Sequence, residues 1–201
     1  MPVVPEHTAG TPAAERLARV RLYVVTAAED PPERVLTTVR AARDAGAEVV
    51  QLRRKGEDAR LTLRLAERCR ELVPPGGGTL FIVNDRVDIA MAAGADGVHL
   101  GQAFAAQAEG ADYIGVGPVW ATPTKPGRPA VGLELVRAVA AARLRIPWVA
   151  IGGVDGTTVD AVLAAGARAV AAVRAVTAAS DPEAAARGLH AAVRAAVVAA
   201  S

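Results

Sequence analysis

The stretch AAGADGV at residues 92–98 decides the fold, because the same pattern occurs three more times along the chain. The other copies are DAGAEVV at 44–50, AEGADYI at 108–114 and AAGARAV at 164–170. Each copy combines the end of a helix, a glycine that can adopt a positive φ, and the start of an apolar strand. Gly-Ala pairs are common in any alanine-rich chain, but four copies that each precede an apolar run favour a structural repeat.

The alternation extends outward from these copies over most of the chain. Seven short apolar runs predict buried strands at residues 22–25, 49–52, 80–83, 97–100, 113–116, 148–151 and 169–173. The segments between them predict helices at residues 33–45, 59–72, 87–93, 133–142, 158–165 and 182–198. Residues 1–19 lack this periodicity and predict a loose, partly disordered N-terminal extension of a single domain spanning residues 1–201. The alternation indicates an α/β fold with a parallel sheet, either doubly wound or closed as a barrel.

The spacing of the four repeat glycines favours the barrel and reveals a gap in it. They lie 48, 16 and 56 residues apart, so the middle interval is too short for one strand–helix unit of ~30 residues. We therefore expect a (β/α)8 TIM barrel whose fifth strand and flanking helices, roughly 25–30 residues, are missing between Gln102 and Ala103. A seven-stranded remnant would expose sheet edges, which favours a missing stretch over a natural deletion.

Composition excludes several classes of protein. Of 201 residues, 52% are hydrophobic but only 3% aromatic, which is typical of helices packed on parallel strands through small aliphatic side chains. The formal charge of +2, without any Lys/Arg-rich run, excludes a nucleic-acid surface and favours a small anionic substrate. No apolar run reaches the ~18 residues of a membrane span, and no signal peptide opens the chain. A single cysteine, Cys69, predicts a protein of the reducing cytoplasm.

Polar residues follow the predicted strands, at the ends where such barrels carry their active sites. Gln51, Arg53 and Lys55 alternate onto one face after the second strand, although a solvated loop would be an equally good interpretation of that run alone. Asn84 and Asp85 follow the third strand and offer an amide and a carboxylate to Mg²⁺. Taken alone, Asp85 is more typical of a helix N-cap than of a metal ligand.

Three further segments suggest anion binding. The loop at residues 117–128 contains Thr122, Thr124 and Lys125, and could be a lid over an anion or an ordinary proline-rich connection. The last two strands end at residues 150–153 and 173–175, where barrels frequently bind phosphate through backbone N–H groups, although paired glycines also make simple tight turns. His99 lies inside an apolar run, which favours a hydrogen-bonded core histidine over a catalytic one.

Six of these motifs, in this order, resemble the thiamine-phosphate synthase family over about residues 22–188. They are QLRRK (51–55), IVNDR (82–86), GVHLGQ (97–102), GVGP (115–118), TPTK (122–125) and AIGG (150–153). The resemblance implies an enzyme, a transferase of thiamine biosynthesis, that joins 4-amino-2-methyl-5-(diphosphomethyl)pyrimidine to 4-methyl-5-(2-phosphoethyl)thiazole and releases pyrophosphate with the help of Mg²⁺. These two phosphorylated small molecules would be its partners, and a homo-oligomer stays open.

The resemblance also implies a role for each matching residue. Those that would hold the pyrimidine diphosphate are Gln51, Arg53, Lys55, Asn84 and Lys125, with Asp85 on Mg²⁺. Those that would hold the thiazole phosphate are Thr122 and Thr124, together with the backbones of Gly153, Val173 and Arg174. Arg53, Lys55 and Lys125 would be catalytic, because they neutralise charge that develops on the leaving pyrophosphate. The residues provide no Ser/His/Asp set, cysteine nucleophile or paired carboxylates for covalent or acid–base catalysis.

The sequence departs from the family where the interval is short. The family follows its His-Leu-Gly-Gln motif with an acidic pair that supplies a second Mg²⁺ ligand, whereas Ala103 and Phe104 follow Gln102 here. The fifth strand, which carries a Ser and a His in the family, is absent as well. Two alternatives therefore stay open: a thiazole tautomerase of the same fold, and a non-catalytic protein that binds thiazole phosphate.

Overall fold

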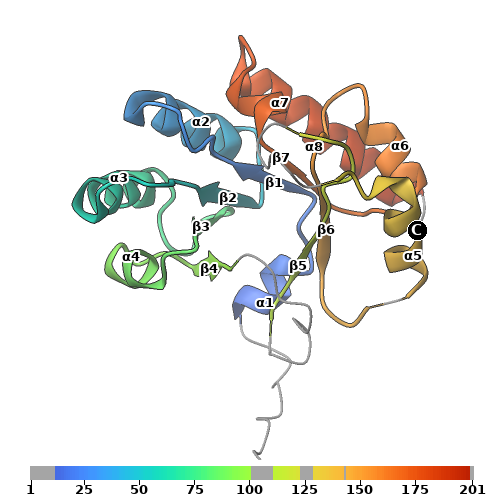
Figure 1. Cartoon of the computed structure of the whole chain (residues 1–201), viewed down its shortest axis with the longest axis horizontal. Coiled ribbons are helices and arrows are strands. Elements are labelled where there is room, and N and C mark those ends of the chain that lie inside the picture. Colours follow the sequence, from blue (N-terminus) through green and yellow to red (C-terminus); the bar gives the residue numbers. More distant parts are fainter. Residues whose placement is uncertain (1–11, 101–110, 123–128, 143, 200–201) are drawn as a thin grey trace, which may run out of the picture.

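The computed structural model describes residues 12–100, 111–122, 129–142 and 144–199, and its centre is a parallel sheet of seven strands (Figure 1). The strands are β1 (Leu22–Val25), β2 (Val49–Leu52), β3 (Leu80–Asn84), β4 (Gly97–His99), β5 (Ile114–Val116), β6 (Trp148–Ile151) and β7 (Val170–Ala172). All seven were predicted, each to within one residue. The regularity follows from the repeat, in which a glycine with positive φ, such as Gly46, Gly94 or Gly166, ends a helix just before a strand.

Eight helices occur in the described part of the chain. They are α1 (Pro12–Leu17), α2 (Pro32–Asp44), α3 (Ala59–Leu72), α4 (Val87–Ala92), α5 (Gly132–Ala141), α6 (Val159–Ala164), α7 (Arg174–Thr177) and α8 (Pro182–Ala199). The six predicted helices are present with bounds within one residue. None of the helices within the described ranges has the length and apolar character that a membrane crossing requires.

The sheet is open, with the order β4-β3-β2-β1-β7-β6-β5. β1 is central and pairs with β2 and β7, whereas each of the edge strands β4 and β5 has one partner among the described strands. The predicted α/β class and parallel sheet are therefore confirmed, with the seven strands that the sequence provides. The junction between Gln102 and Ala103, where the missing unit was expected, lies outside the described residues.

Two apolar clusters pack on the two faces of the sheet. The larger cluster joins the outer face to the surrounding helices and includes Leu22, Val24 and Phe81. The smaller lies on the inner face and consists of Leu17, Val20, Tyr23, Val25, Val49, Leu80, Ile82, Val149, Ala169 and Ala171. Alternate residues of each strand divide between the clusters, so every second side chain along a strand points to the inner face.

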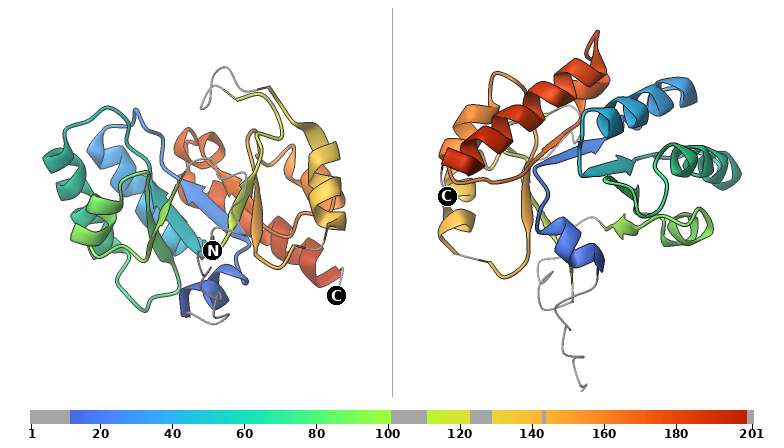
Figure 2. Two further views of the ribbon diagram at one scale, coloured as in Figure 1. Left: turned by 60° about the horizontal axis from the view of Figure 1, so that its bottom comes forward. Right: turned by 180° about the vertical axis from the view of Figure 1, so that it is seen from behind.

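Helix α1 corrects the expected loose extension for residues 12–17, whereas residues 1–11 lie outside the described residues. Leu17 and the following Val20 are buried and belong to the inner cluster. In Figures 1 and 2 the helix lies on the open side of the molecule, near the amino ends of the strands. No repeat glycine follows these six residues to mark a helix end in the sequence, and packing against the inner face stabilises the helix.

Candidate functional site

The loop after β2 carries the first group of predicted residues. Gln51 is buried on the inner face, and its Nε2 donates to the hydroxyl of Tyr23 at 2.6 Å. Arg53 is also buried, which is unusual for a cation, and its backbone N–H donates to the hydroxyl of Thr26 at 3.0 Å. Lys55 is exposed at the tip of the loop. The exposed fraction of the residue therefore increases from Gln51 through Arg53 to Lys55, towards and beyond the carboxyl end of β2.

A chain of hydrogen bonds spans the inner face beneath this loop. From Gln51 it passes through the hydroxyls of Tyr23 and Tyr113, which lie 2.8 Å apart, to Nδ1 of His99 at 2.7 Å from Tyr113. Burial raises the pKa of Tyr23 well above its ordinary value and that of Tyr113 to about 12. His99 is therefore hydrogen-bonded, as predicted, and this contact links the end of β4 to the residue that precedes β5.

Asn84 and Asp85 lie together where β3 ends. The Asn84 Nδ2 donates to Oδ2 of Asp85 at 2.6 Å, and the backbone N–H of Asp85 donates to the carbonyl of His99. Asp85 has a φ of 62°, the one positive value at a non-glycine residue in the described ranges. Such a backbone conformation costs free energy and is concentrated at functional sites. The alternative assignment of Asp85 as a helix cap is wrong, because α4 has Arg86 at its N-cap and no side-chain cap bond.

Lys55 and Asp85 line the same pocket. Its volume is about 290 Å³, and its other walls come from Arg54, Gly56, Glu57, Thr62 and Arg86. Lys55 follows β2 and Asp85 follows β3, and these two strands are neighbours in the sheet. The pocket therefore brings together an amine and a carboxylate, the kinds of group that bind phosphate oxygens and divalent metals in proteins. Among the described residues, no group of three or more His, Cys, Asp or Glu side chains is arranged to hold a metal ion.

A second, larger cleft of about 400 Å³ lies at the other half of the same sheet end. It contains every described residue that was predicted to hold the thiazole phosphate, namely Thr122, Gly153, Val173 and Arg174. Gly153 has a φ of 71°, and a Cβ atom there would lie 2.8 Å from Cβ of Trp120. Glycine is required at this position both by conformation and by the close approach of the 117–122 segment.

Two of the predicted residues, Thr124 and Lys125, lie outside the described residues. Their position relative to the two pockets therefore stays a prediction.

Asp155 also lines the larger cleft, although it was not among the predicted residues. Its Oδ1 accepts hydrogen bonds from the N–H and hydroxyl of Thr157 and from the N–H of Thr158. The hydrogen bond from Thr157 contributes most to lowering the pKa of this carboxyl. An aspartate followed by two threonines just before a helix is a typical turn signal, so the pattern could have been found.

Comparison with known proteins identifies the family. The family model described as "Thiamine monophosphate synthase" matches residues 22–105 and, as a separate segment, residues 102–176. The chain belongs to the thiamine-phosphate synthase family. It is thus related to transferase enzymes of thiamine biosynthesis, as the six sequence motifs predicted.

Relatives in several bacteria share more than two fifths of their aligned residues with the chain. The thiamine-phosphate synthase of Gloeobacter violaceus is 47% identical over 83% of this chain, which spans 55% of that protein. Those of Thermobifida fusca and Thermus thermophilus are 44% and 45% identical over 87% and 85% of this chain, and it spans 93% and 95% of them. The solved "Thiamine phosphate pyrophosphorylase from Pyrococcus furiosus" superposes with a TM-score of 0.77 at 29% identity, covering 90% of this chain and 98% of that one.

These alignments also concern the short interval of 16 residues between the repeat glycines Gly94 and Gly110. The alignment with the Thermobifida fusca relative runs over 203 residues although it takes up 87% of a 201-residue chain, so the relative contains residues that this chain lacks. The shortfall is close to the ~30 residues of one strand–helix unit. The two segments matched by the family model meet at residues 102–105, where the glycine spacing placed the gap.

Proposed function

We propose that the chain is a thiamine-phosphate synthase that joins 4-amino-2-methyl-5-(diphosphomethyl)pyrimidine to 4-methyl-5-(2-phosphoethyl)thiazole and releases pyrophosphate. One observation carries this proposal: Lys55 and Asp85, assigned to the diphosphate and its Mg²⁺, line one pocket, whereas Thr122, Gly153, Val173 and Arg174, assigned to the thiazole phosphate, line another. Two pockets at the carboxyl ends of parallel strands suit an enzyme that brings two phosphorylated molecules together.

The smaller pocket would bind the diphosphate. Lys55 lies at its rim, Arg53 is buried at the base of the same loop, and Asn84 fixes the Asp85 carboxylate by a 2.6 Å hydrogen bond. Mg²⁺ fits this arrangement, because it is usually bound by one or two carboxylates together with substrate phosphates rather than by a full set of protein ligands. Asp85 would hold it, with Asn84 beside it, and the ion would supply positive charge to the departing pyrophosphate.

The larger cleft would bind the thiazole phosphate. Thr122, Gly153, Val173 and Arg174 all line it. The backbones of Gly153, Val173 and Arg174 and the hydroxyl of Thr122 would hold the phosphate. The short helix α7 begins at Arg174, and phosphate sites of related barrels commonly use such a helix after the last strand. We assign Thr124 to the thiazole phosphate and Lys125 to the pyrimidine diphosphate, because both belong to the motif TPTK.

The chemistry requires charge stabilisation rather than a covalent intermediate. The bond between the pyrimidine methylene and the diphosphate oxygen breaks, and its electron pair leaves with pyrophosphate. The resulting cation is stabilised by the electron-rich aminopyrimidine, and the thiazole nitrogen then forms the new C–N bond. Arg53, Lys55 and Lys125 would neutralise the negative charge as it develops. Cys69 takes no part, since burial raises the pKa of its thiol to about 12.

The proposed partners are these two small phosphorylated substrates, not a nucleic acid or a membrane. A reducing cytoplasm is the compartment that we propose, because the single cysteine is free and buried.

A second candidate function follows from the open sheet. The larger cleft is lined by residues of β6, β7, their loops and the 118–122 segment after β5, all of which this chain contains. The expected missing unit would instead follow β4, where the His99 carbonyl accepts a hydrogen bond from Asp85 of the proposed diphosphate pocket. A chain without the fifth unit could retain the thiazole-phosphate site and lose the transfer reaction. It would then bind thiazole phosphate without catalysis.

A single assay separates the two candidates. The purified protein is supplied with both substrates and Mg²⁺, and thiamine phosphate and pyrophosphate are measured together with the binding of thiazole phosphate alone. Equal amounts of the two products support the synthase. Binding without either product would overturn it in favour of the second candidate, and absence of both would contradict the two assignments.

A further inference from the structure

The loop that carries Lys55 is held by a pair of residues to which the family motifs assign no function. Arg54 donates from Nε and Nη2 to the two carboxylate oxygens of Glu57, at 2.8 and 2.6 Å. Its third nitrogen, Nη1, donates to the backbone carbonyl of Asp30 in the loop after β1. The Arg54 guanidinium therefore bridges the ends of the Lys55–Gly56 turn and fastens that turn to the neighbouring loop.

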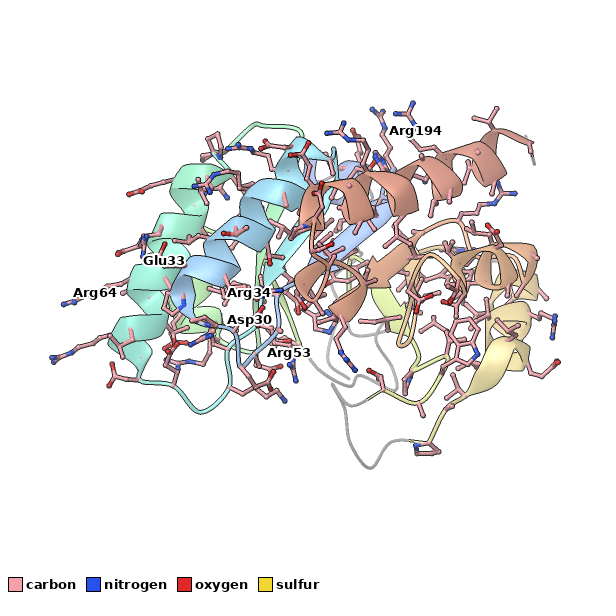
Figure 3. The ribbon with its side chains drawn as sticks, turned by 90° about the horizontal axis from the view of Figure 1, so that it is seen from above. Asp30, Glu33, Arg34, Arg53, Arg64 and Arg194 are labelled. Carbon is pink, nitrogen blue, oxygen red and sulfur yellow. The ribbon has the colours of Figure 1, made fainter. Side chains whose placement is uncertain are left out.

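The contacts of both partners extend this arrangement. Glu57 also accepts a hydrogen bond from the hydroxyl of Thr62 on α3. Asp30 lies 3.9 Å from Arg34, which donates to the carbonyl of Thr177 on α7 (Figure 3). The side chains of Arg54 and Glu57 are only 11% and 23% exposed, so solvent screens their bidentate contact less than it would at the surface.

Charge alone does not explain why Arg54 is in the pocket wall. Its positive charge is matched by Glu57, and that of Arg86 is matched by Asp88. Lys55 is exposed and pairs with no carboxylate in the part of the chain that the structure describes. Lys55 thus provides the uncompensated positive charge, whereas the Arg54 pair contributes a fixed backbone shape around it.

We propose that Arg54 and Glu57 are positioning residues, whose ion pair holds the Lys55 turn in the shape that binds a diphosphate. This inference rests on the proposed function, since it takes the pocket of Lys55 and Asp85 as the diphosphate site. Preorganisation of this kind lowers the ordering cost of binding and is lost when the pair is broken.

The test uses Glu57→Gln, because charge and shape predict opposite results for it. Removing a negative charge next to the pocket should strengthen anion binding if electrostatics alone matter. Loss of the bidentate contact should instead weaken binding of Mg²⁺-pyrophosphate by about tenfold, measured by calorimetry. Arg54→Lys keeps the charge but cannot form the planar bidentate contact, and should weaken binding in the same direction.

Glu33→Gln is the matched control, because it also removes one carboxylate from an Arg pair, with Arg68, but at an exposed position between α2 and α3. It should leave pyrophosphate affinity unchanged. Binding of thiazole phosphate at the other cleft should stay at the parent level in all three variants, which shows that they are folded. Equal or tighter pyrophosphate binding by Glu57→Gln would overturn the inference alone. Failure of the parent to bind pyrophosphate would overturn the proposed function as well.

Discussion

Asp85 combines a left-handed backbone with a position on the wall of the pocket that we propose for the diphosphate. Asparagine tolerates the same conformation, so Asp85→Asn removes the charge without changing the backbone preference. We expect the Mg²⁺ concentration needed for half-maximal pyrophosphate binding to rise about tenfold. The melting temperature should change little.

Asp44→Asn is the control for this prediction. Asp44 is an exposed carboxylate at the end of α2, away from the pocket, and the hydrogen bond from Arg43 lowers its pKa. Its replacement should leave the Mg²⁺ dependence as it was. An unchanged Mg²⁺ dependence in Asp85→Asn would remove Asp85 from the metal site.

The two tyrosines provide a pH prediction at the same scale, because Tyr23 and Tyr113 are the only tyrosines in the chain. Burial raises the pKa of both, and that of Tyr113 to about 12. An unfolded chain ionises its tyrosines near pH 10, so their contribution to stability is complete below pH 10 and is lost as the pH rises towards 12. The absorbance of tyrosinate should therefore stay low through pH 10 and rise only when the protein unfolds. A midpoint near pH 10 with the fold intact would contradict the buried hydrogen-bonded pair.

Residue types and strand alternation indicated which strand ends carry polar groups. The family resemblance assigned Lys55 and Asp85 to the same substrate, and the structure places both on one pocket. The Arg54–Glu57 pair could not, since its role depends on the loop conformation that brings three nitrogen atoms to Glu57 and Asp30. The hydrogen bond of His99 was expected, but its partner, Tyr113, is specified only by the packing of the inner face.

The loop between β6 and α6 gives a prediction at the scale of an element. In Gly153→Ala, the left-handed φ would cost about 1–2 kcal/mol, and the new Cβ would meet Trp120. The loop must then move away from the cleft, so affinity for thiazole phosphate should fall at least several-fold, by calorimetry. Gly156→Ala in the same loop is the matched control, because no atom lies within 4 Å of its Cβ position. If Gly153→Ala and Gly156→Ala lowered the affinity for thiazole phosphate equally, the phosphate would have to bind elsewhere.

The glycine repeat, rather than length, decided which elements were predicted well. The strand ends at β2 and β7 follow from apolar runs bounded by this repeat, and the six-residue helices α4 and α6 precede its glycines Gly94 and Gly166. Helices α1 and α7 contain six and four residues, and no repeat glycine follows them to mark a helix end. Packing on the inner face and at the cleft stabilises them instead.

At the scale of the whole molecule, the open sheet leaves apolar side chains exposed. Met91 on α4 and Leu100 after β4 are 78% and 60% exposed, next to the unpaired edge of β4. Inserting the corresponding strand–helix unit of the Thermus thermophilus relative between Gln102 and Ala103 should cover them. Burial of two large side chains predicts a gain of roughly 3–5 kcal/mol in the free energy of unfolding by urea titration.

An insert of equal length made of glycine and serine is the control, and it should give no gain. Amide hydrogen exchange in β4 and β5 should slow only with the natural unit, because backbone pairing then protects both edges. Fast exchange at both edges despite the natural insert would show that the sheet does not close there.

The order of the strands also divides the sheet into two groups of paired strands, each formed by one continuous part of the sequence. Strands β1 to β4 pair within residues 22–100, β5 to β7 pair within residues 114–172, and the β1–β7 pairing joins the two groups, supported by α8 packed against α2. A cut in the connection between Leu100 and Ala111 would break none of these pairings. The protein is therefore suited to fragment complementation, in which two separately expressed pieces reassemble and the binding of thiazole phosphate reports their encounter.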